Sequence, residues 1–227
     1  MYSEVKPILD TLSVPNMQAS LSNLTAFHNR YYNSTTGAQA SEWILNKVKN
    51  YTSDRSDILV SFYNHSWLQP SVTAKFLSSS PSSPRTIIGA HLDSINKTDP
   101  MNGRAPGADD DGTGTVNLIE AFQALVAANY RPTTPLEFHW YSAEEVGLLG
   151  SQEIATSYDE AGIDVKAMIQ FDMSGYFKPG SQEVIAMESD YIDEELTDFV
   201  KSIITTYSYL PPADDIPVKT ALSFLMA

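Results

Sequence analysis

The chain of 227 residues is expected to fold as an α/β domain, with a mixed, mostly parallel central sheet and helices on both faces. Two observations indicate this fold. Short apolar runs typical of buried strands alternate with longer segments whose apolar side chains recur at helical spacing. Acidic or histidine-bearing segments follow several of these runs, as ligand-binding residues do beyond the carboxyl ends of strands in open α/β sheets.

The first third of the chain is expected to contain two helices and two strands. Residues 16–32 and 38–51 have the spacing of amphipathic helices, and Trp43 belongs to the apolar face of the second. Residues 58–62 and 71–76 are rich in β-branched and aromatic side chains, and the second run alternates as a half-buried strand does. A loop rich in Ser and Pro is expected to follow.

The remaining elements continue the alternation of strands and helices. In chain order we expect a strand at 86–90, a polar loop at 94–111, a helix at 113–128, a strand at 136–141, a helix at 150–160, strands at 165–171 and 184–187, and a helix at 193–207. Neither an internal repeat nor a linker is visible in the sequence. Residues 1–227 are therefore expected to form a single domain.

Composition excludes several functions. The formal net charge of -14 disfavours binding to nucleic acid or to anionic membranes, because both would repel the chain. The absence of cysteine excludes disulfides and thiolate metal sites. No apolar run is long enough to span a bilayer, and the first residues lack the pattern of a signal peptide. Five N-glycosylation sequons nevertheless favour a secreted glycoprotein, and they begin at Asn23, Asn33, Asn50, Asn64 and Asn96.

Four polar segments are the candidate functional residues. His91, Glu144 with Glu145, and Asp172 each follow an expected strand, whereas Asp109–Asp111 open an expected helix. Each alone has an ordinary explanation, such as a helix cap or a solvated turn. Because the carboxyl ends of parallel strands meet at one edge of a sheet, these groups are expected to converge there.

A divalent cation is the expected partner of this acidic cluster. Crowded carboxylates repel, and burying them is unfavourable without positive charge. No Lys or Arg lies close in sequence to Glu144, Glu145 or Asp172. One imidazole with several carboxylates suits a catalytic zinc site, whereas Mg²⁺ or Mn²⁺ would not specially require His91.

Neighbouring residues have expected supporting roles. Asp93, two residues after His91, can accept the second N–H of the same ring and fix its tautomer. The adjacent pair Glu144 and Glu145 point in different directions, so that one can bind metal while the other acts as a base. A base beside an activated water is what metal-assisted hydrolysis requires.

With these segments the sequence resembles the co-catalytic di-zinc aminopeptidases, and most closely the secreted fungal leucine aminopeptidases. The resemblance covers roughly residues 10–207 and rests on four blocks that occur in the family's order. The blocks are Gly-Ala-His-Leu-Asp-Ser at 89–94, Ala-Pro-Gly-Ala-Asp-Asp-Asp-Gly-Thr-Gly at 105–114, Ser-Ala-Glu-Glu-Val-Gly-Leu-Leu-Gly-Ser at 142–151, and Gln-Phe-Asp-Met at 170–173.

The resemblance implies a zinc-exopeptidase-like fold and a role for each matched residue. His91 and Asp172 would bind one zinc, Asp110 would bridge two zincs, and Glu145 would bind the second. Glu144 would be the general base, and Asp93 would orient His91. The resemblance also implies a cis peptide bond between Asp110 and Asp111.

The chain departs from the family pattern at its C-terminal end. The family has a further histidine on the second zinc, within a Ser-Asp-His segment, and no histidine follows Asp172 here. Of the four histidines only His91 fits the site, and His139 is expected to be a core or sheet-face residue. Residues 208–227 are a divergent tail, which leads us to expect a C-terminally truncated domain with a weakened second zinc site.

The expected function is therefore a metallo-aminopeptidase that releases leucine-like N-terminal residues from peptides with zinc-activated water. The expected partners are peptide substrates, with no nucleic acid and no membrane, and the protein is expected to be a secreted monomer. Two alternatives stay open: an inactive truncated or binding form of the same fold, and a single-zinc glutaminyl cyclase. An assay on an aminoacyl chromogenic substrate distinguishes the aminopeptidase from the inactive form. The number of zinc ions per chain distinguishes it from the glutaminyl cyclase.

Overall fold

The computed structural model describes residues 2–214. These residues fall into two compact units, with the division between Met173 and Ser174. The elements of the first unit are α1 (Tyr2–Leu9), α2 (Val14–Ala26), α3 (Thr35–Tyr51), β1 (Ile58–Tyr63), β2 (Ser71–Phe76), β3 (Arg85–His91), α4 (Gly112–Ala127), β4 (Leu136–Tyr141), α5 (Leu149–Glu160) and β5 (Val165–Gln170). Those of the second are β6 (Ile185–Met187), α6 (Glu194–Tyr207) and β7 (Pro212–Asp214). The expectation of a single domain over residues 1–227 stays a prediction.

The central sheet belongs to the first unit and has the strand order β1-β2-β4-β3-β5. β3 pairs in parallel with both β4 and β5, whereas β2 pairs antiparallel with β1 and β4. Four strands therefore run in one direction and β2 alone runs in the other. This confirms the expected mixed, mostly parallel sheet, and it brings the carboxyl ends of β3, β4 and β5 to one edge.

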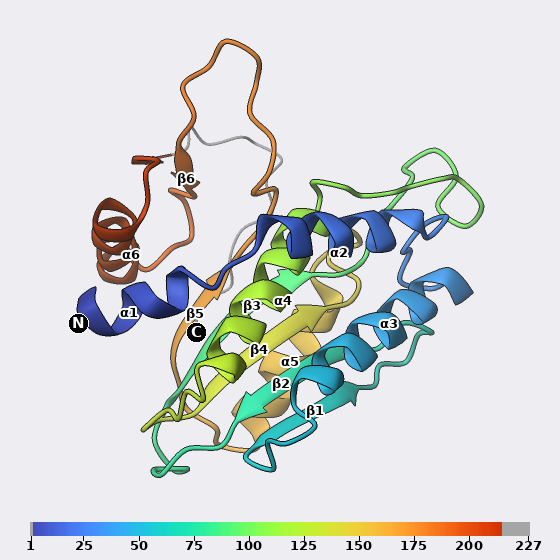
Figure 1. Cartoon of the computed structure of the whole chain (residues 1–227). Helices are drawn as coiled ribbons and strands as arrows, with labels where there is room; N and C mark the ends of the chain where they lie inside the picture. The colour runs from blue at the N-terminus through green and yellow to red at the C-terminus, as the bar shows by residue number, and fades with distance from the viewer. Residues whose placement is uncertain (1, 215–227) are drawn as a thin grey trace. The chain divides into compact units, whose positions relative to one another are not determined.

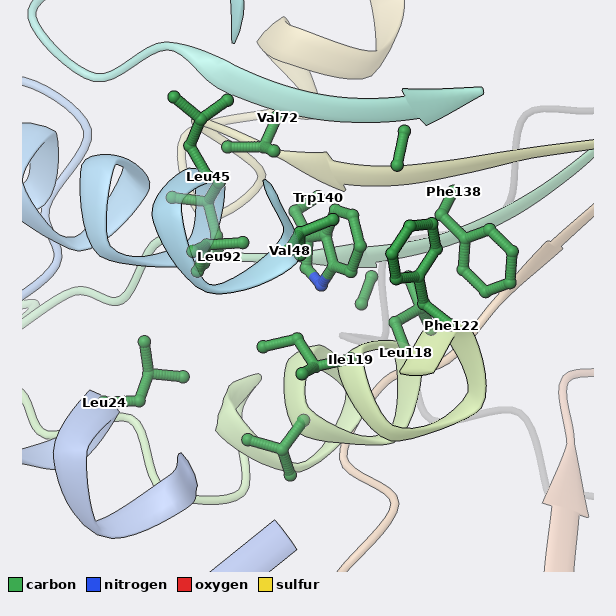
Figure 2. Close-up of a cluster of buried hydrophobic side chains, with 14 of the residues drawn as sticks. Leu24, Leu45, Val48, Val72, Leu92, Leu118, Ile119, Phe122, Phe138 and Trp140 are labelled. Carbon is green, nitrogen blue, oxygen red and sulfur yellow. The ribbon is translucent and has the colours of Figure 1, made fainter. Parts of the chain in front are cut away.

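The main hydrophobic core lies between one face of the sheet and the helices α2, α3 and α4 (Figure 1). Figure 2 shows Phe122 and Ile119 of α4 facing Phe138 and Trp140 of β4. The rings of Phe122 and Phe138 pack edge to face with centroids 5.4 Å apart. Alternate residues of β4 point into this core, as the pleat of a strand requires.

The opposite face of the sheet is partly covered by α5 and is more polar. Ile154 and Tyr158 of α5 pack against Ile87 and Tyr141 in a second, smaller apolar cluster. Glu137 and His139 of β4 are buried on this face. Helices therefore lie on both faces, as the sequence predicted.

The helix boundaries differ most from expectation near residue 30. The helix expected over 16–32 begins at Val14, where Ser13 caps it by accepting a hydrogen bond from the backbone N–H of Asn16. It ends at Ala26, because the backbone of Arg30 instead exchanges hydrogen bonds with Ser94. α3 then begins after its own cap, Ser34. The strands β2 and β4 have the bounds expected from the sequence.

The second unit contains a two-stranded parallel sheet of β6 and β7 and the helix α6. Asp193 caps α6 by accepting from the backbone N–H of Leu196 at 2.9 Å. The expected divergent tail, 208–227, lies from residue 215 onward outside the described residues. No helix within residues 2–214 combines the length and the apolar character needed to cross a membrane.

Candidate metal centre

The topology brings three of the candidate segments to the same edge of the sheet. β3 ends at His91, Glu144 follows the end of β4, and Asp172 follows the end of β5. Asp110 immediately precedes Asp111, the residue that caps the N-terminus of α4. The convergence predicted from strand ends is therefore present in the fold.

The imidazole of His91 is the centre of the cluster and is completely buried. Its Nε2 lies 3.0 Å from Oδ1 of Asp110, 3.7 Å from Oδ2 of Asp172 and 3.8 Å from Oε2 of Glu144. His91, Asp110 and Asp172 each present one ligand atom, and these three atoms lie within 4.8 Å of one another. One cation of ordinary coordination distance could contact all three groups.

Asp93 joins the His91 ring to the loop that carries the two glutamates. Its Oδ1 lies 3.3 Å from Nδ1 of His91 and accepts from the backbone N–H of Glu144 at 3.0 Å. Its Oδ2 accepts from the backbone N–H of Glu145 at 3.2 Å. The side chain is 1% exposed, so these contacts satisfy a buried carboxylate. These contacts fit a residue that orients the His91 ring, and that role for Asp93 stays a prediction.

Asp111 ties the start of α4 to the end of β3. Its carboxylate accepts from the backbone N–H of Gly114 at 2.9 Å and from that of His91 at 3.1 Å. A side chain at Gly114 would meet this carboxylate and the Phe171 carbonyl, so only glycine permits the close approach. The peptide bond between Asp110 and Asp111 is cis, which confirms the expectation drawn from the resemblance.

Glu145 stands apart from the three-residue group. Among the described residues, only His91, Asp110 and Asp172 form a cluster of three or more ligands at this spacing. Burial and then the neighbouring Asp110 carboxylate raise the pKa of Glu145 to about 7. The side chain is thus near Asp110, and its binding to a second ion stays a prediction.

The electrostatics of the cluster fit a bound cation. Burial, together with the carboxylates of Asp93, Asp172 and Asp110, raises the pKa of Glu144 to about 7 against the opposing effect of His91. Burial likewise raises the pKa of Asp172, with Asp110 among the contributors. Such raised values mean that negative charge here is poorly compensated, and a divalent ion would supply the missing positive charge.

Arg30 is a buried neighbour of the cluster that no sequence pattern predicted. Its buried guanidinium donates to the carbonyls of Leu92 at 2.7 Å, Gly107 at 2.9 Å and Pro106. Burial lowers its pKa to about 10, and Asp93 and nearby carboxylates oppose that change. Arg30 holds the loop before Asp110 against the end of β3. Its single charge cannot balance the whole cluster.

The other histidines lie in different surroundings. His28 Nε2 lies 2.7 Å from the carbonyl of Asn102, and His65 lies between Glu153 and Ser71. His139 is buried on the sheet face, which confirms the expectation for that residue. Only His91 is part of the acidic cluster.

Comparison with known proteins gives a consistent family likeness. A family model described as peptidase family M28 matches residues 71–216. Leucine aminopeptidase 1 of Sclerotinia sclerotiorum is 42% identical over 219 residues, which are 91% of this chain and 56% of that protein. The chain therefore spans about half the length of the curated relatives it matches.

Solved structures share the fold. The LapA aminopeptidase of Legionella pneumophila superposes with a TM-score of 0.86 and 30% identity, covering 93% of this chain and 56% of that one. A glutaminyl cyclase of Tannerella forsythia superposes with a TM-score of 0.66 and 18% identity, covering 92% of this chain and 79% of that one. The second likeness concerns the fold alone.

Proposed function

The chain belongs to peptidase family M28, and on that premise we propose that the whole protein is a zinc aminopeptidase that releases leucine-like N-terminal residues from peptides. One observation carries the proposal. The ligand atoms of the buried His91 ring, Asp110 and Asp172 are close enough together to bind one metal ion, and Glu144 lies beside them. The names of the relatives, which are leucine aminopeptidases, support the reaction and the preferred residue.

His91, Asp110 and Asp172 would hold the first zinc ion. Zinc accepts imidazole and carboxylate ligands, and a catalytic site normally has three protein ligands with an open position. When bound, the ion would polarise the scissile carbonyl and lower the pKa of a water molecule. Asp110 and Glu145 are the ligands we propose for a second ion.

Glu144 is the proposed general base. Its Oε2 lies 3.8 Å from Nε2 of His91, close to the group that would bind the metal but outside it. From that place the carboxylate can take a proton from water and deliver it to the leaving amine. Asp93 contacts both the backbone N–H of Glu144 and the ring of His91, so it holds the proposed base at a fixed distance from the proposed metal ligand.

The glutaminyl cyclase alternative is less well supported. Its structural likeness has 18% identity, against 30% for the LapA aminopeptidase. Measuring zinc per chain in the natural-length protein distinguishes the two, because the resemblance implies one zinc for a cyclase and two for an aminopeptidase.

We further propose that the protein is a secreted, glycosylated monomer. Asn33 and Asn64 begin sequons in exposed, irregular segments, whereas the side chain of Asn96 is engaged with the carbonyl of Arg104. Expression through a secretory pathway should therefore give glycopeptides containing Asn33 or Asn64 in mass spectrometry. A secreted product without any glycan would refute the glycosylation.

The substitution Glu144→Gln tests the proposed function. In the zinc-loaded protein at its natural length, the variant should lose most turnover of leucine p-nitroanilide, by roughly 100-fold or more, because a proton carrier is removed. Zinc content should stay unchanged. Glu42→Gln, on an exposed position of α3, is the matched control and should behave as the unsubstituted protein. Loss of zinc from Glu144→Gln would instead make Glu144 a ligand, and wild-type protein without aminopeptidase activity would refute the function.

A further inference from the structure

We propose that Trp67 is a positioning residue for the Glu144 loop, acting through Ser142. This inference deepens the proposed function and rests on it for the catalytic role of Glu144. Trp67 lies in the irregular segment between β1 and β2, far in sequence from the glutamates. Its indole Nε1–H donates to Oγ of Ser142 at 2.9 Å.

Ser142 is held through every polar atom it has. Its hydroxyl accepts from Trp67 and donates to Oε1 of Gln69 at 2.8 Å. Its backbone N–H donates to Oγ of Ser71 at 3.0 Å, and its carbonyl accepts from the N–H of Gly150 at 3.1 Å. Ser142 is completely buried, so each of these bonds replaces solvent. The residue is therefore a fixed starting point for the loop that follows β4.

The segment that holds Ser142 is itself anchored from two sides. The amide of Gln69 donates to the carbonyls of Arg30 at 2.9 Å and Gly37 at 3.2 Å. The ring of Trp67 stacks on His65, with centroids 4.4 Å apart and planes 7° apart. The stacking on His65 restricts the orientation of the Trp67 ring, and this keeps its indole N–H directed at Ser142.

The aromatic stack has a polar support of its own. His65 Nδ1 lies 2.6 Å from Oε2 of Glu153, and its Nε2 lies 2.7 Å from Oγ of Ser71. A serine, a histidine and a carboxylate in this order resemble a hydrolytic triad. Ser71 is completely buried and already accepts from Ser142, so no substrate can reach it. The arrangement supports the loop and does not form a second reactive centre.

The loop between Ser142 and Glu144 is short enough to transmit a shift. Only Ala143 separates the two residues, and its φ of 59° is in the left-handed region that non-glycine residues rarely adopt. Asp93 holds the backbone N–H groups of Glu144 and Glu145 at the other end. Loosening Ser142 would remove one support of the Glu144 backbone, whose remaining supports are Asp93 and the backbone N–H groups of Gly147 and Leu148. A displacement of about 1 Å at a reacting group can lower turnover about 100-fold.

Trp67→Phe removes the N–H and keeps an aromatic ring, so it is the first test. In the zinc-loaded protein at its natural length, kcat should fall by about 10-fold or more with KM and zinc content little changed. Hydrogen exchange at the amides of Glu144 and Glu145 should become faster, while exchange in β3 stays slow. In a Glu144→Gln background the substitution should lower the residual turnover no further. Trp43→Phe, at a half-buried position of α3, removes an indole N–H away from this loop and is the matched control.

Unchanged exchange at Glu144 and Glu145 together with unchanged kcat would overturn the proposal. An equal loss of turnover in the Glu144→Gln background would also overturn it, because Trp67 would then act elsewhere. If Trp67→Phe loosens the whole protein, Ser142→Ala is the second variant, and it should give the same local exchange and the same kcat loss. If the unsubstituted protein lacks aminopeptidase activity and Trp67→Phe still makes exchange at Glu144 and Glu145 faster, the positioning role is supported and the proposed function is refuted.

Discussion

At the level of single residues, Asp93 connects the metal group to the proposed base. One carboxylate contacts the His91 ring and two successive backbone N–H groups of the glutamate loop. Asp93→Asn replaces one acceptor oxygen with an amide donor, which cannot accept from the loop. We expect zinc affinity to fall about 10- to 100-fold, as when partners of metal ligands are substituted elsewhere.

Competition with a chromogenic chelator would measure that affinity without any assay of turnover. Asp54→Asn, on an exposed position after α3, is the control and should leave the affinity unchanged. An Asp93→Asn protein that binds zinc as tightly as the unsubstituted one would contradict the orienting role.

The close approach of the three residues was predictable because two of them lie at or just after strand ends and the third precedes a helix at the same edge of the sheet. His91, Asp110 and Asp172 are close together as expected, and the Asp93 contact follows from its two-residue separation from His91. Arg30 was not predictable in this way. Its guanidinium reaches Leu92 across 62 residues, and it lies in a segment that has the spacing of a helix but is not one. Contacts of this kind depend on tertiary packing, which local patterns do not encode.

At the level of elements, β4 carries a buried ionic network on the face opposite the main core. Glu137 receives hydrogen bonds from His139 at 2.9 Å and Tyr158 at 2.5 Å. It also pairs with Arg85 at 2.6 Å and Lys75 at 3.4 Å. Burial acts to raise the pKa of Glu137, but the bond from His139 and the other partners outweigh it and lower the pKa from 4.5 to about 2.

This network predicts a pH-dependent contribution of Glu137 to stability. Because the folded pKa is depressed, the contribution is present above about pH 4.5 and is lost as pH falls toward about 2. The shift corresponds to about 3 kcal/mol in the free energy of unfolding. Glu137→Gln should therefore be less stable by roughly that amount at pH 7, and the difference should narrow between pH 4.5 and 2.

Urea unfolding followed by circular dichroism at several pH values would test this prediction. Comparing the variant with the unsubstituted protein cancels the titration of the other carboxylates, and Glu42→Gln, at an exposed position of α3, is the matched control. A stability difference that is constant from pH 7 to pH 2 would argue against an ionised, paired Glu137.

The type and the bounds of an element were predictable where one pattern dominated, and the bounds were not predictable where tertiary contacts end the element. β2 and β4 match the expected bounds because strong alternation or a buried run defines them. α2 ends six residues before its expected end because tertiary hydrogen bonds of Arg30 outweigh helical spacing there. α1 and β7 were not expected, since each is short.

At the level of the whole molecule, the sheet supplies one edge at which distant residues form a metal group. The parallel pairing of β3 with β4 and β5 places His91, the glutamate loop and Asp172 together. The chain spans 56% of the length of a leucine aminopeptidase relative, so activity, substrate and the second ion are proposals about the whole protein. The metal group itself lies within the described residues and can be tested directly.

A crystal grown with zinc, with diffraction data collected on both sides of the zinc absorption edge, tests the central claim most directly. We expect an anomalous difference peak within coordination distance of His91 Nε2 and of one carboxylate oxygen each from Asp110 and Asp172. Glu144 should face that peak without binding it. The absence of a peak at this position, in crystals whose protein has taken up zinc elsewhere, would contradict the account.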